Sequence, residues 1–365
     1  MKSLIVILLL SQCIVSFAGE LRYAQNFSIA AFEGYKEITV RNTWKGAGDH
    51  EQVYALVPRG AELPELAPGA VVVRTPVERL AIMATVFLGP IRDLDLYDSL
   101  IGIAHLDYAN DERAHELVAS GVAREIQSGS GMDVESMLML QPDLILTSTT
   151  GNANFDVHPQ MRRAGLPVVV TASYMEKHPL ARTEWIKFVA AFYDKEAEAE
   201  RIFDGIAQRY EALVSLTRNV KNRPSVFSSA PYSGVWHVPG GKSYTATAFR
   251  HAGADYLWSD NEATGGVPLD VEVILQRAGD ADYWLNPSHY DSIRALLAAD
   301  ERFAGFKALQ KGRVYNNTVR VNAKGGNDIF ERGVSHPEEV LADLIKIFHP
   351  ELLPEHDFVF YEKLK

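Results

Sequence analysis

The chain has 365 residues, of which 47% are hydrophobic and 23% are charged, a globular composition with enough apolar material for two domains. Its formal net charge is −11 and its basic residues form no cluster, which argues against nucleic acid or an anionic membrane as a partner. Beyond the N-terminal segment, no apolar run approaches the roughly 18 residues that a membrane-spanning helix needs.

The N-terminus has the three parts of a secretory signal peptide. A charged start at Lys2 precedes an apolar run from Leu4 to Phe17, and the small residues Ala18 and Gly19 follow it. We therefore expect residues 1–18 to be a signal peptide that is cleaved after Ala18, and the mature protein to be exported and soluble.

The only cysteine is Cys13, which lies inside this apolar run. Cleavage after Ala18 would leave a mature chain with no disulfide, thiolate metal site or cysteine nucleophile. The alternative is a lipoprotein signal, in which Leu10-Ser11-Gln12-Cys13 is the processing box and Cys13 is the lipidated first residue. Gln12 fits poorly just before that cysteine, so we favour the cleaved signal peptide.

The segment after the signal peptide, residues 19–72, is typical of β-structure. The runs F-S-I-A-A-F, K-E-I-T-V-R, Q-V-Y-A-L-V and A-V-V-V-R are separated by Gly, Pro and Asn. We predict a β-rich N-terminal extension that packs on the first lobe.

Strands and helices alternate through residues 73–178, which indicates a mostly parallel sheet covered by helices. This segment is the predicted N-terminal lobe. Its predicted helices are 79–88, 112–119, 132–140 and 158–164, and its predicted strands are 99–103, 144–147 and 168–171.

Two connecting helices, 179–193 and 195–220, are predicted within residues 179–222. The second is about 26 residues or about 39 Å long, enough to cross between two lobes. Its apolar residues have helical spacing: Ile202, Phe203, Ile206, Tyr210, Leu213 and Val214.

A second α/β series in residues 223–365 predicts a C-terminal lobe. Ser335 and Glu338 have the spacing of a capping box at the start of its last helix. The predicted strands are 225–229, 283–285 and 314–316, and the predicted helices are 244–251, one beginning at Asp270, 292–299 and 337–348.

One helix-to-strand pattern occurs in both halves of the chain. Asp133-Val134-Glu135 opens the first copy and Asp270-Val271-Glu272 opens the second. Each begins with an Asp suited to capping and a Glu in the first turn, which are also common in any helix. The repetition favours two similar α/β lobes, each with an acidic residue at a corresponding place.

Aromatic residues follow several predicted strands, where ligands of open α/β sheets bind. They are Tyr108 and Tyr174 in the first lobe and Tyr232 and Trp236 in the second. Packing is the commoner role of any one aromatic, but four on loops that would face a cleft favour a large, flat or greasy ligand.

Polar residues of two further loops are candidates for the same cleft. Gly240-Gly241-Lys242-Ser243 ends like a P-loop, but Trp236 stands where that motif needs glycine, so it predicts only a Gly-rich turn with free N–H groups before a helix. Five side chains of the segment 314–328 would lie at the cleft rim or in a solvated turn: Arg320, Asn322, Lys324, Asn327 and Asp328.

No pattern of catalytic residues stands out. The eleven histidines include no H-x-H or H-E-x-x-H, and no G-x-S-x-G elbow is present. Two alternatives to plain binding stay open. One is a bare-metal site built from His105, His178 and His237, and the other is a chelatase-like enzyme that uses His105, His237 and Asp328.

The chain resembles the periplasmic binding proteins for iron-siderophores and vitamin B12, which feed importers of the ATP-binding cassette (ABC) type. The resemblance covers about residues 73–350, and the segments before and after it depart from the family core. The motifs that carry it are D-V-E-S-M-L-M-L-Q-P-D-L-I-L, the long helix from Lys195, G-G-K-S-Y, A-G-A-D-Y-L-W, V-P-L-D-V-E and G-R-V-Y-N-N.

The resemblance implies an α/β fold of two doubly wound lobes, bridged by one long rigid helix, with the ligand cleft between the lobes. It implies a periplasmic monomer that is not an enzyme and needs no cofactor. The protein would capture a metal chelate, an iron-siderophore first and cobalamin or haem as alternatives, and deliver it to an ABC permease at the inner membrane.

The resemblance also assigns roles to residues. It implies that Glu135 and Glu272 pair with arginines of the permease. The residues that it places around the chelate are Tyr108, Tyr174, Tyr232, Trp236, Ser243 and Tyr244.

Overall fold

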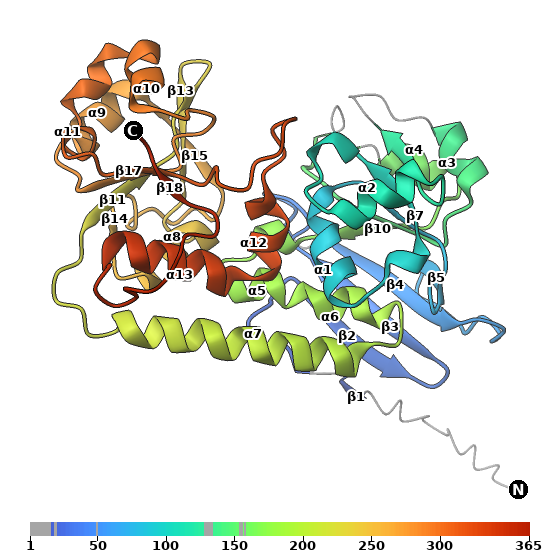
Figure 1. The fold of residues 1–365 in the computed structure, drawn as a ribbon. Coiled ribbons are helices and arrows are strands. Elements are labelled where there is room, and N and C mark those ends of the chain that lie inside the picture. The colour runs from blue at the N-terminus through green and yellow to red at the C-terminus, as the bar shows by residue number, and fades with distance from the viewer. Residues whose placement is uncertain (1–15, 18–19, 49, 128–133, 153–155, 157) are drawn as a thin grey trace, which may run out of the picture.

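The computed structural model describes residues 16–17, 20–48, 50–127, 134–152, 156 and 158–365. Two α/β lobes stand side by side, and the long helix α7 (Glu196–Thr217) runs beneath both of them (Figure 1). Its 22 residues span about 33 Å, which is the length needed to connect the lobes. The predicted fold class is confirmed.

The N-terminal extension, together with the short strand β1 that precedes it, forms a five-stranded sheet in the order β1-β2-β3-β4-β5. Neighbouring strands are antiparallel except for β4 and β5, which are parallel. The strands are β1 (Ser16–Phe17), β2 (Phe27–Phe32), β3 (Tyr35–Arg41), β4 (Glu51–Pro58) and β5 (Val71–Thr75).

This sheet packs on both the first lobe and the connecting helices. The ring of Phe27 lies 4.6 Å from that of Trp185, and the Tyr54 hydroxyl accepts a hydrogen bond of 2.9 Å from the Val170 N–H of the first lobe. The buried carboxylate of Glu184 accepts the N–H groups of residues 22–24. The extension therefore stabilises the junction between the lobe and the connecting helices.

The N-terminal lobe is built on a parallel sheet in the order β10-β9-β6-β7-β8. Its strands are β6 (Leu80–Ile82), β7 (Leu100–Ala104), β8 (Arg124–Gln127), β9 (Leu144–Ser148) and β10 (Val168–Thr171). Its helices are α1 (Leu88–Asp93), α2 (Glu112–Ala119), α3 (Val134–Leu140) and α4 (His158–Arg163).

The prediction of a helix over residues 79–88 is wrong, because its first half is the central strand β6. Leu80, Ala81 and Ile82 are fully buried between β7 and β9. A strand that is covered on both faces is apolar throughout, so its sequence lacks the alternation that marks a half-buried strand. The short strand β8 was also not predicted from the sequence.

The first connecting helix is interrupted. It divides into α5 (Pro179–Thr183) and α6 (Trp185–Ala191) at Glu184, whose carboxylate binds the N-terminal extension. Every residue of α6 is buried, including Lys187, whose ammonium pairs with Glu184 at 3.0 Å. This helix is therefore part of the core rather than an exposed linker.

The C-terminal lobe has a central sheet in the order β14-β11-β16-β17-β18, parallel except for β18. A three-stranded antiparallel sheet, β12-β13-β15, lies beside it. The strands are β11 (Ser225–Ser228), β12 (Pro231–Tyr232), β13 (Val235–Pro239), β14 (Asp255–Tyr256), β15 (Gly266–Asp270), β16 (Tyr283–Leu285), β17 (Val314–Asn316) and β18 (Glu362–Lys363).

The tail after Pro350 belongs to this lobe, since β18 pairs with β17 and the buried Asp343 carboxylate accepts N–H groups of residues 359–361. The helices of the lobe are α8 (Tyr244–His251), α9 (Val271–Ala278), α10 (Ile293–Ala299), α11 (Lys307–Gln310), α12 (Arg332–Ser335) and α13 (Pro337–Phe348).

The predicted capping box before α13 is wrong. Ser335 belongs to α12, and His336 precedes α13 without a side-chain capping bond. Glu338 pairs with Arg209 and His336 instead.

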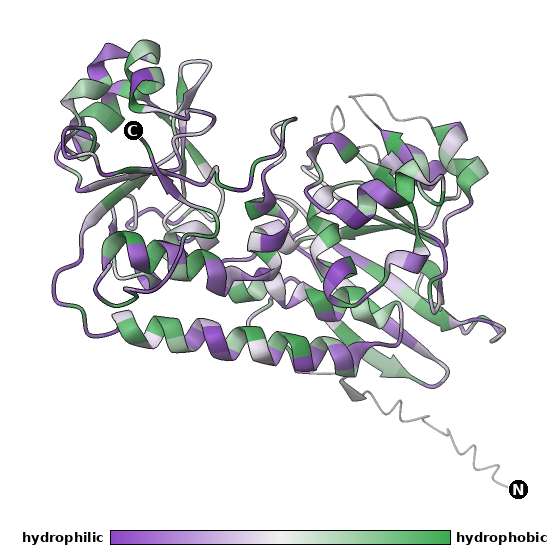
Figure 2. Ribbon diagram, in the orientation of Figure 1, coloured by the Kyte–Doolittle hydropathy of each residue, from purple (hydrophilic) through white to green (hydrophobic). Residues whose placement is uncertain are grey.

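One continuous cluster of buried apolar residues runs from the N-terminal sheet through α6 and α7 into the C-terminal lobe. Phe27, Phe188, Phe203 and Phe249 are members drawn from these successive parts. Hydrophobic residues concentrate on the inner strands and on the facing sides of the helices (Figure 2). The lobes therefore share a core.

Candidate ligand cleft

A cavity of about 880 Å³ opens beside the junction of the two lobes. Its floor consists of the loops after β11 and β16, the β12–β13 hairpin and the start of α8. Pro179 and Arg182 of α5, the loop that follows β17, residues of α12 and α13, and Tyr361 of the tail form its wall. The carboxyl ends of parallel strands thus border the cavity, as in other open α/β sheets.

The polar part of the lining consists of amide, hydroxyl and imidazole side chains and the Arg182 guanidinium among the described residues. Among the described residues that line the cavity, none carries a carboxylate, whereas Asn286, Asn317 and Asn327 contribute amides. The Arg182 guanidinium stacks on the Tyr244 ring at 4.2 Å, and its buried Nε has no hydrogen-bond partner among the described residues. This chemistry suits a ligand with negative charge or many oxygen acceptors.

Large apolar side chains surround the cavity and remain open to solvent. Tyr232 is 78% exposed, Phe330 58% and Val321 37%, and all three line the cavity. Exposed apolar groups beside a cavity mark a surface that a partner or ligand covers.

Two of the aromatic residues that sequence reasoning assigned to the ligand, Tyr232 and Tyr244, line the cavity. Trp236 does not, because it is fully buried in the C-terminal lobe against Trp284 and Phe303. Its indole N–H donates to the Ser228 carbonyl oxygen at 3.0 Å. The prediction that Trp236 contacts the ligand is therefore wrong.

The Gly-rich turn before α8 is used internally. Ser243 is buried, and its hydroxyl accepts the Ala246 N–H at 3.1 Å as a helix cap, so it does not line the cavity. The N–H groups of Gly240 and Lys242 donate to the carbonyl oxygens of residues 265 and 263. The prediction that free N–H groups of this turn face a ligand is wrong.

The two aromatic residues of the first lobe lie outside the cavity lining. The Tyr174 hydroxyl donates to the carbonyl oxygens of Thr149 and Thr43, at 2.8 and 3.2 Å. Tyr108 is 53% exposed and follows the carboxyl end of β7 in a 3₁₀ turn. Neither residue is part of the cavity lining.

Residues 317–331, which we call the strap, leave β17 and cross toward the first lobe (Figure 1). Asn322 and Asn327 line the cavity, as expected for residues at a cleft rim. Arg320, Lys324 and Asp328 do not line it, and Asp328 is buried in an ion pair with Arg320 at 2.5 Å.

Sequence reasoning missed several residues of the lining. These include Asn286, Ser288 and His289, which directly follow β16, and this strand-end position is the signal that pointed to the other loops. Arg182 lies in a helix between the lobes, and no motif distinguishes it.

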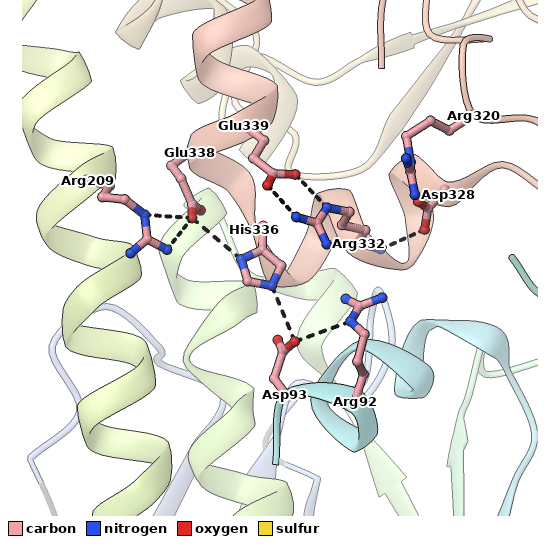
Figure 3. Close-up of polar contacts among 9 residues, drawn as sticks. All are labelled: Arg92, Asp93, Arg209, Arg320, Asp328, Arg332, His336, Glu338 and Glu339. Carbon is pink, nitrogen blue, oxygen red and sulfur yellow. Dashed lines mark hydrogen bonds and ion pairs between the residues drawn. The ribbon is translucent and has the colours of Figure 1, made fainter. Parts of the chain in front are cut away.

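A polar network joins both lobes and α7 (Figure 3). His336 lies at the start of α13, with its Nε2 3.3 Å from Asp93 Oδ1 of α1 and its Nδ1 3.5 Å from Glu338 Oε1. Arg209 of α7 donates to Glu338 at 2.6 Å. Burial lowers the pKa of His336, but the two carboxylates outweigh it and raise the pKa to about 9.

The histidines proposed for a bare-metal site are not brought together. No group of three or more His, Cys, Asp or Glu side chains within the described residues could hold a metal ion. His237 lines the cavity, whereas His178 accepts the Leu180 N–H at 3.1 Å beside His251. The predicted set of His105, His178 and His237 is therefore wrong.

Comparison with known proteins identifies the family. A model described as "Periplasmic binding protein" matches residues 89–318, more than half of the chain. The chain belongs to this family. It is a substrate-binding protein and not an enzyme, so the chelatase-like alternative is set aside.

One relative of this binding protein is an uncharacterized lipoprotein of Methanocaldococcus jannaschii. It is 27% identical over 303 residues, which are 80% of this chain and 70% of that protein. A helix long and apolar enough to span a membrane is absent from the residues that the model describes.

Two solved structures show the same fold. A possible iron-binding (periplasmic solute-binding) protein from Staphylococcus epidermidis has a TM-score of 0.58 at 17% identity, and the match covers 75% of this chain and 100% of that one. The haem-binding protein RhuT from a Roseiflexus species has a TM-score of 0.56 at 18% identity, covering 75% and 99%.

The two glutamates expected to dock the binding protein on a permease lie in the first turns of α3 and α9. Both are exposed, and Glu272 pairs with Arg302 at 2.9 Å. Asp133, the predicted cap of the first helix, lies outside the described residues, and Asp270 makes no side-chain capping bond. The capping role predicted for Asp270 is wrong.

Proposed function

We propose that this binding protein captures an anionic metal chelate, a ferric siderophore first, and presents it to an ABC permease. The carrying observation is the cavity of about 880 Å³, whose lining holds the cation of Arg182 and, among the described residues, no carboxylate. The family match and the iron-binding structural relative support a metal-containing ligand.

The position of Arg182 supports a role in recognising charge. Stacking on Tyr244 orients the guanidinium, and Arg182 lines the cavity, so the guanidinium can donate hydrogen bonds to an oxyanion of the ligand. A ligand oxygen bound there would gain a charge-assisted hydrogen bond in a partly dehydrated site. The asparagine amides offer further donors to chelate oxygens.

Haem and cobalamin are second candidates. The observation that favours them is the exposed apolar border of the cavity, where Tyr232, Val321 and Phe330 suit a large ring system. The haem-binding structural relative supports the same class.

Isothermal titration of the purified protein tests the proposal with four probes: a ferric catecholate, a ferric hydroxamate, haemin and cyanocobalamin. We expect the anionic ferric catecholate to bind at micromolar concentration or below, and Arg182→Gln to weaken it about tenfold or more. Lys242→Gln, which changes a half-exposed cation outside the lining, is the matched control. Absence of binding by all four probes would refute the proposal.

Delivery and location follow from the same proposal. We propose that the protein acts as a monomer on the outer side of the inner membrane, released by signal cleavage after Ala18 or anchored by lipidated Cys13. The relative that is named a lipoprotein supports the second route. Metabolic labelling with a radioactive fatty acid distinguishes them, since label that disappears in Cys13→Ser indicates the anchor.

A further inference from the structure

The strap touches two different parts of the protein. One side of it forms a wall of the cavity, to which it contributes Asn317, Val321, Asn322, Ala323, Asn327 and Phe330. Its other side rests on the loop after β7 in the N-terminal lobe, at residues 107–110.

Asn322 makes the central contact. Its Nδ2 donates to the carbonyl oxygens of Asp107 and Ala109, both at 3.0 Å. Its Oδ1 accepts the N–H groups of Lys324 and Gly326, both at 2.9 Å. One side chain therefore shapes the turn of the strap and fastens it to the first lobe.

Two further contacts support this one. The buried Glu331 carboxylate accepts the Asn110 N–H at 3.1 Å. Gly326 lies against the Tyr108 carbonyl so closely that a Cβ would collide with it, and only glycine allows this approach. The ion pair between Lys324 and Asp107, at 3.6 Å, is exposed and contributes little.

The strap is held together by bonds within itself and with its own lobe. Val319 N–H donates to the Phe360 carbonyl oxygen at 3.1 Å, and Asn327 Nδ2 donates to the Asn317 carbonyl oxygen at 2.9 Å. Asp328 N–H donates to the Arg320 carbonyl oxygen at 3.0 Å. These bonds hold the strap in one shape without any contribution from the first lobe.

We propose that the strap is a hinged wall of the cavity, called the roof below, which Asn322 fastens to the carbonyl oxygens of Asp107 and Ala109. A ligand enters and leaves when the strap lifts from the first lobe. The first lobe thus takes part in capture through the strap, although Tyr108 and Tyr174 do not line the cavity. Any role of this movement in transport rests on the proposed function.

Thiol labelling tests the roof without any chelate. Thr245→Cys in the full chain with Cys13→Ser places one thiol on the cavity floor, and its rate of reaction with the bulky fluorescein maleimide reports how far the strap has moved. We expect Asn322→Ala to speed labelling about tenfold, the factor for losing one or two net hydrogen bonds. Thr318→Ala, which lines the cavity but binds Glu362 of its own lobe, should label like the parent.

Equal labelling rates in all three proteins would refute the proposal that the Asn322 contact controls access to the cavity. If Asn322→Ala fails to fold, amide exchange of the unsubstituted protein decides instead. The Asn110 N–H should then exchange by local opening, faster than core amides such as that of Ile82, whereas equal exchange would overturn the proposal. Gated labelling together with failure of all four chelate probes to bind would refute the proposed function and leave the proposal about the strap intact.

Discussion

His336 Nε2 lies 3.3 Å from Asp93 Oδ1, and this contact ties the start of α13 in the C-terminal lobe to the end of α1 in the N-terminal lobe. The side chains of both residues are largely buried, at 17% and 10% exposure. Because Glu338 lies on the other side of the ring, the imidazolium bridges two carboxylates. This contact between the lobes therefore depends on the protonation of His336.

Alkaline pH should weaken this junction. The pKa of His336 is raised to about 9 in the folded protein, against about 6.5 unfolded, so its stabilisation is complete below pH 6.5 and lost as pH rises through 9. We expect His336→Gln to lose up to about 3 kcal/mol at pH 6 and little at pH 10. Urea unfolding at both pH values measures this, and the exposed His289 provides the control variant His289→Gln.

Acidic pH should destabilise the protein around His178 and His251. Burial lowers the pKa values of His178 and His251 to about 4, with smaller effects from the nearby Arg250 cation and, for His251, from His178. The unfolded chain binds these protons below pH 6.5 and the folded chain only near pH 4, so stability falls as pH drops through this window.

The expected loss is up to about 1.4 kcal/mol per pH unit for each histidine between pH 6.5 and 4. His178→Asn retains a side-chain oxygen to accept the Leu180 N–H, and combined with His251→Gln it should flatten the acid slope. An unchanged slope of urea unfolding against pH in the double variant would contradict the assignment.

Substitution of Trp236 should mainly reduce stability, whereas substitution of Tyr232 should mainly reduce chelate binding. Trp236→Ala removes a fully buried side chain and should cost about 3–5 kcal/mol of stability. Tyr232 is 78% exposed at the cavity, so Tyr232→Ala should change stability by less than about 0.5 kcal/mol and weaken chelate binding. Thermal unfolding and titration of both variants measure the difference, and a stable Trp236→Ala protein would argue against its core position.

Substitution of both docking glutamates should separate delivery from capture. Glu135→Lys together with Glu272→Lys should abolish chelate uptake in cells, because like charges would face the arginines expected on the permease. The affinity of the purified protein should be unchanged, since neither residue lines the cavity. Glu262→Lys, at another exposed carboxylate, is the control, and undiminished uptake in the double variant would refute the docking role.

Helices and strands with a local sequence signal, such as a capping residue, could be predicted from the sequence. Helix α2 begins after Asp111, whose carboxylate accepts the Ala114 N–H at 3.0 Å, and its observed bounds equal the predicted ones. The strand β6 carries no such signal, since its residues are apolar on every side and only tertiary pairing shows it to be a strand.

The candidate site was predictable in part for a similar reason. The rule about strand ends found Tyr232, which lines the cavity, whereas Tyr244 was assigned only through the family resemblance. The same rule placed Trp236 in the cleft, because the sequence does not show that β13 turns its indole into the core. The Asn322 contact joins residues more than 200 positions apart, and no local pattern reports it.

The apolar cluster that runs through both lobes has a consequence for how the molecule unfolds. Since α6 and α7 share side-chain contacts with the N-terminal sheet and with α13, neither lobe has a core that is closed without them. Heating should therefore give a single cooperative calorimetric transition rather than one for each lobe. For the same reason, the lobes are poor modules for exchange between relatives, and a chimera would need to retain its own connecting helices.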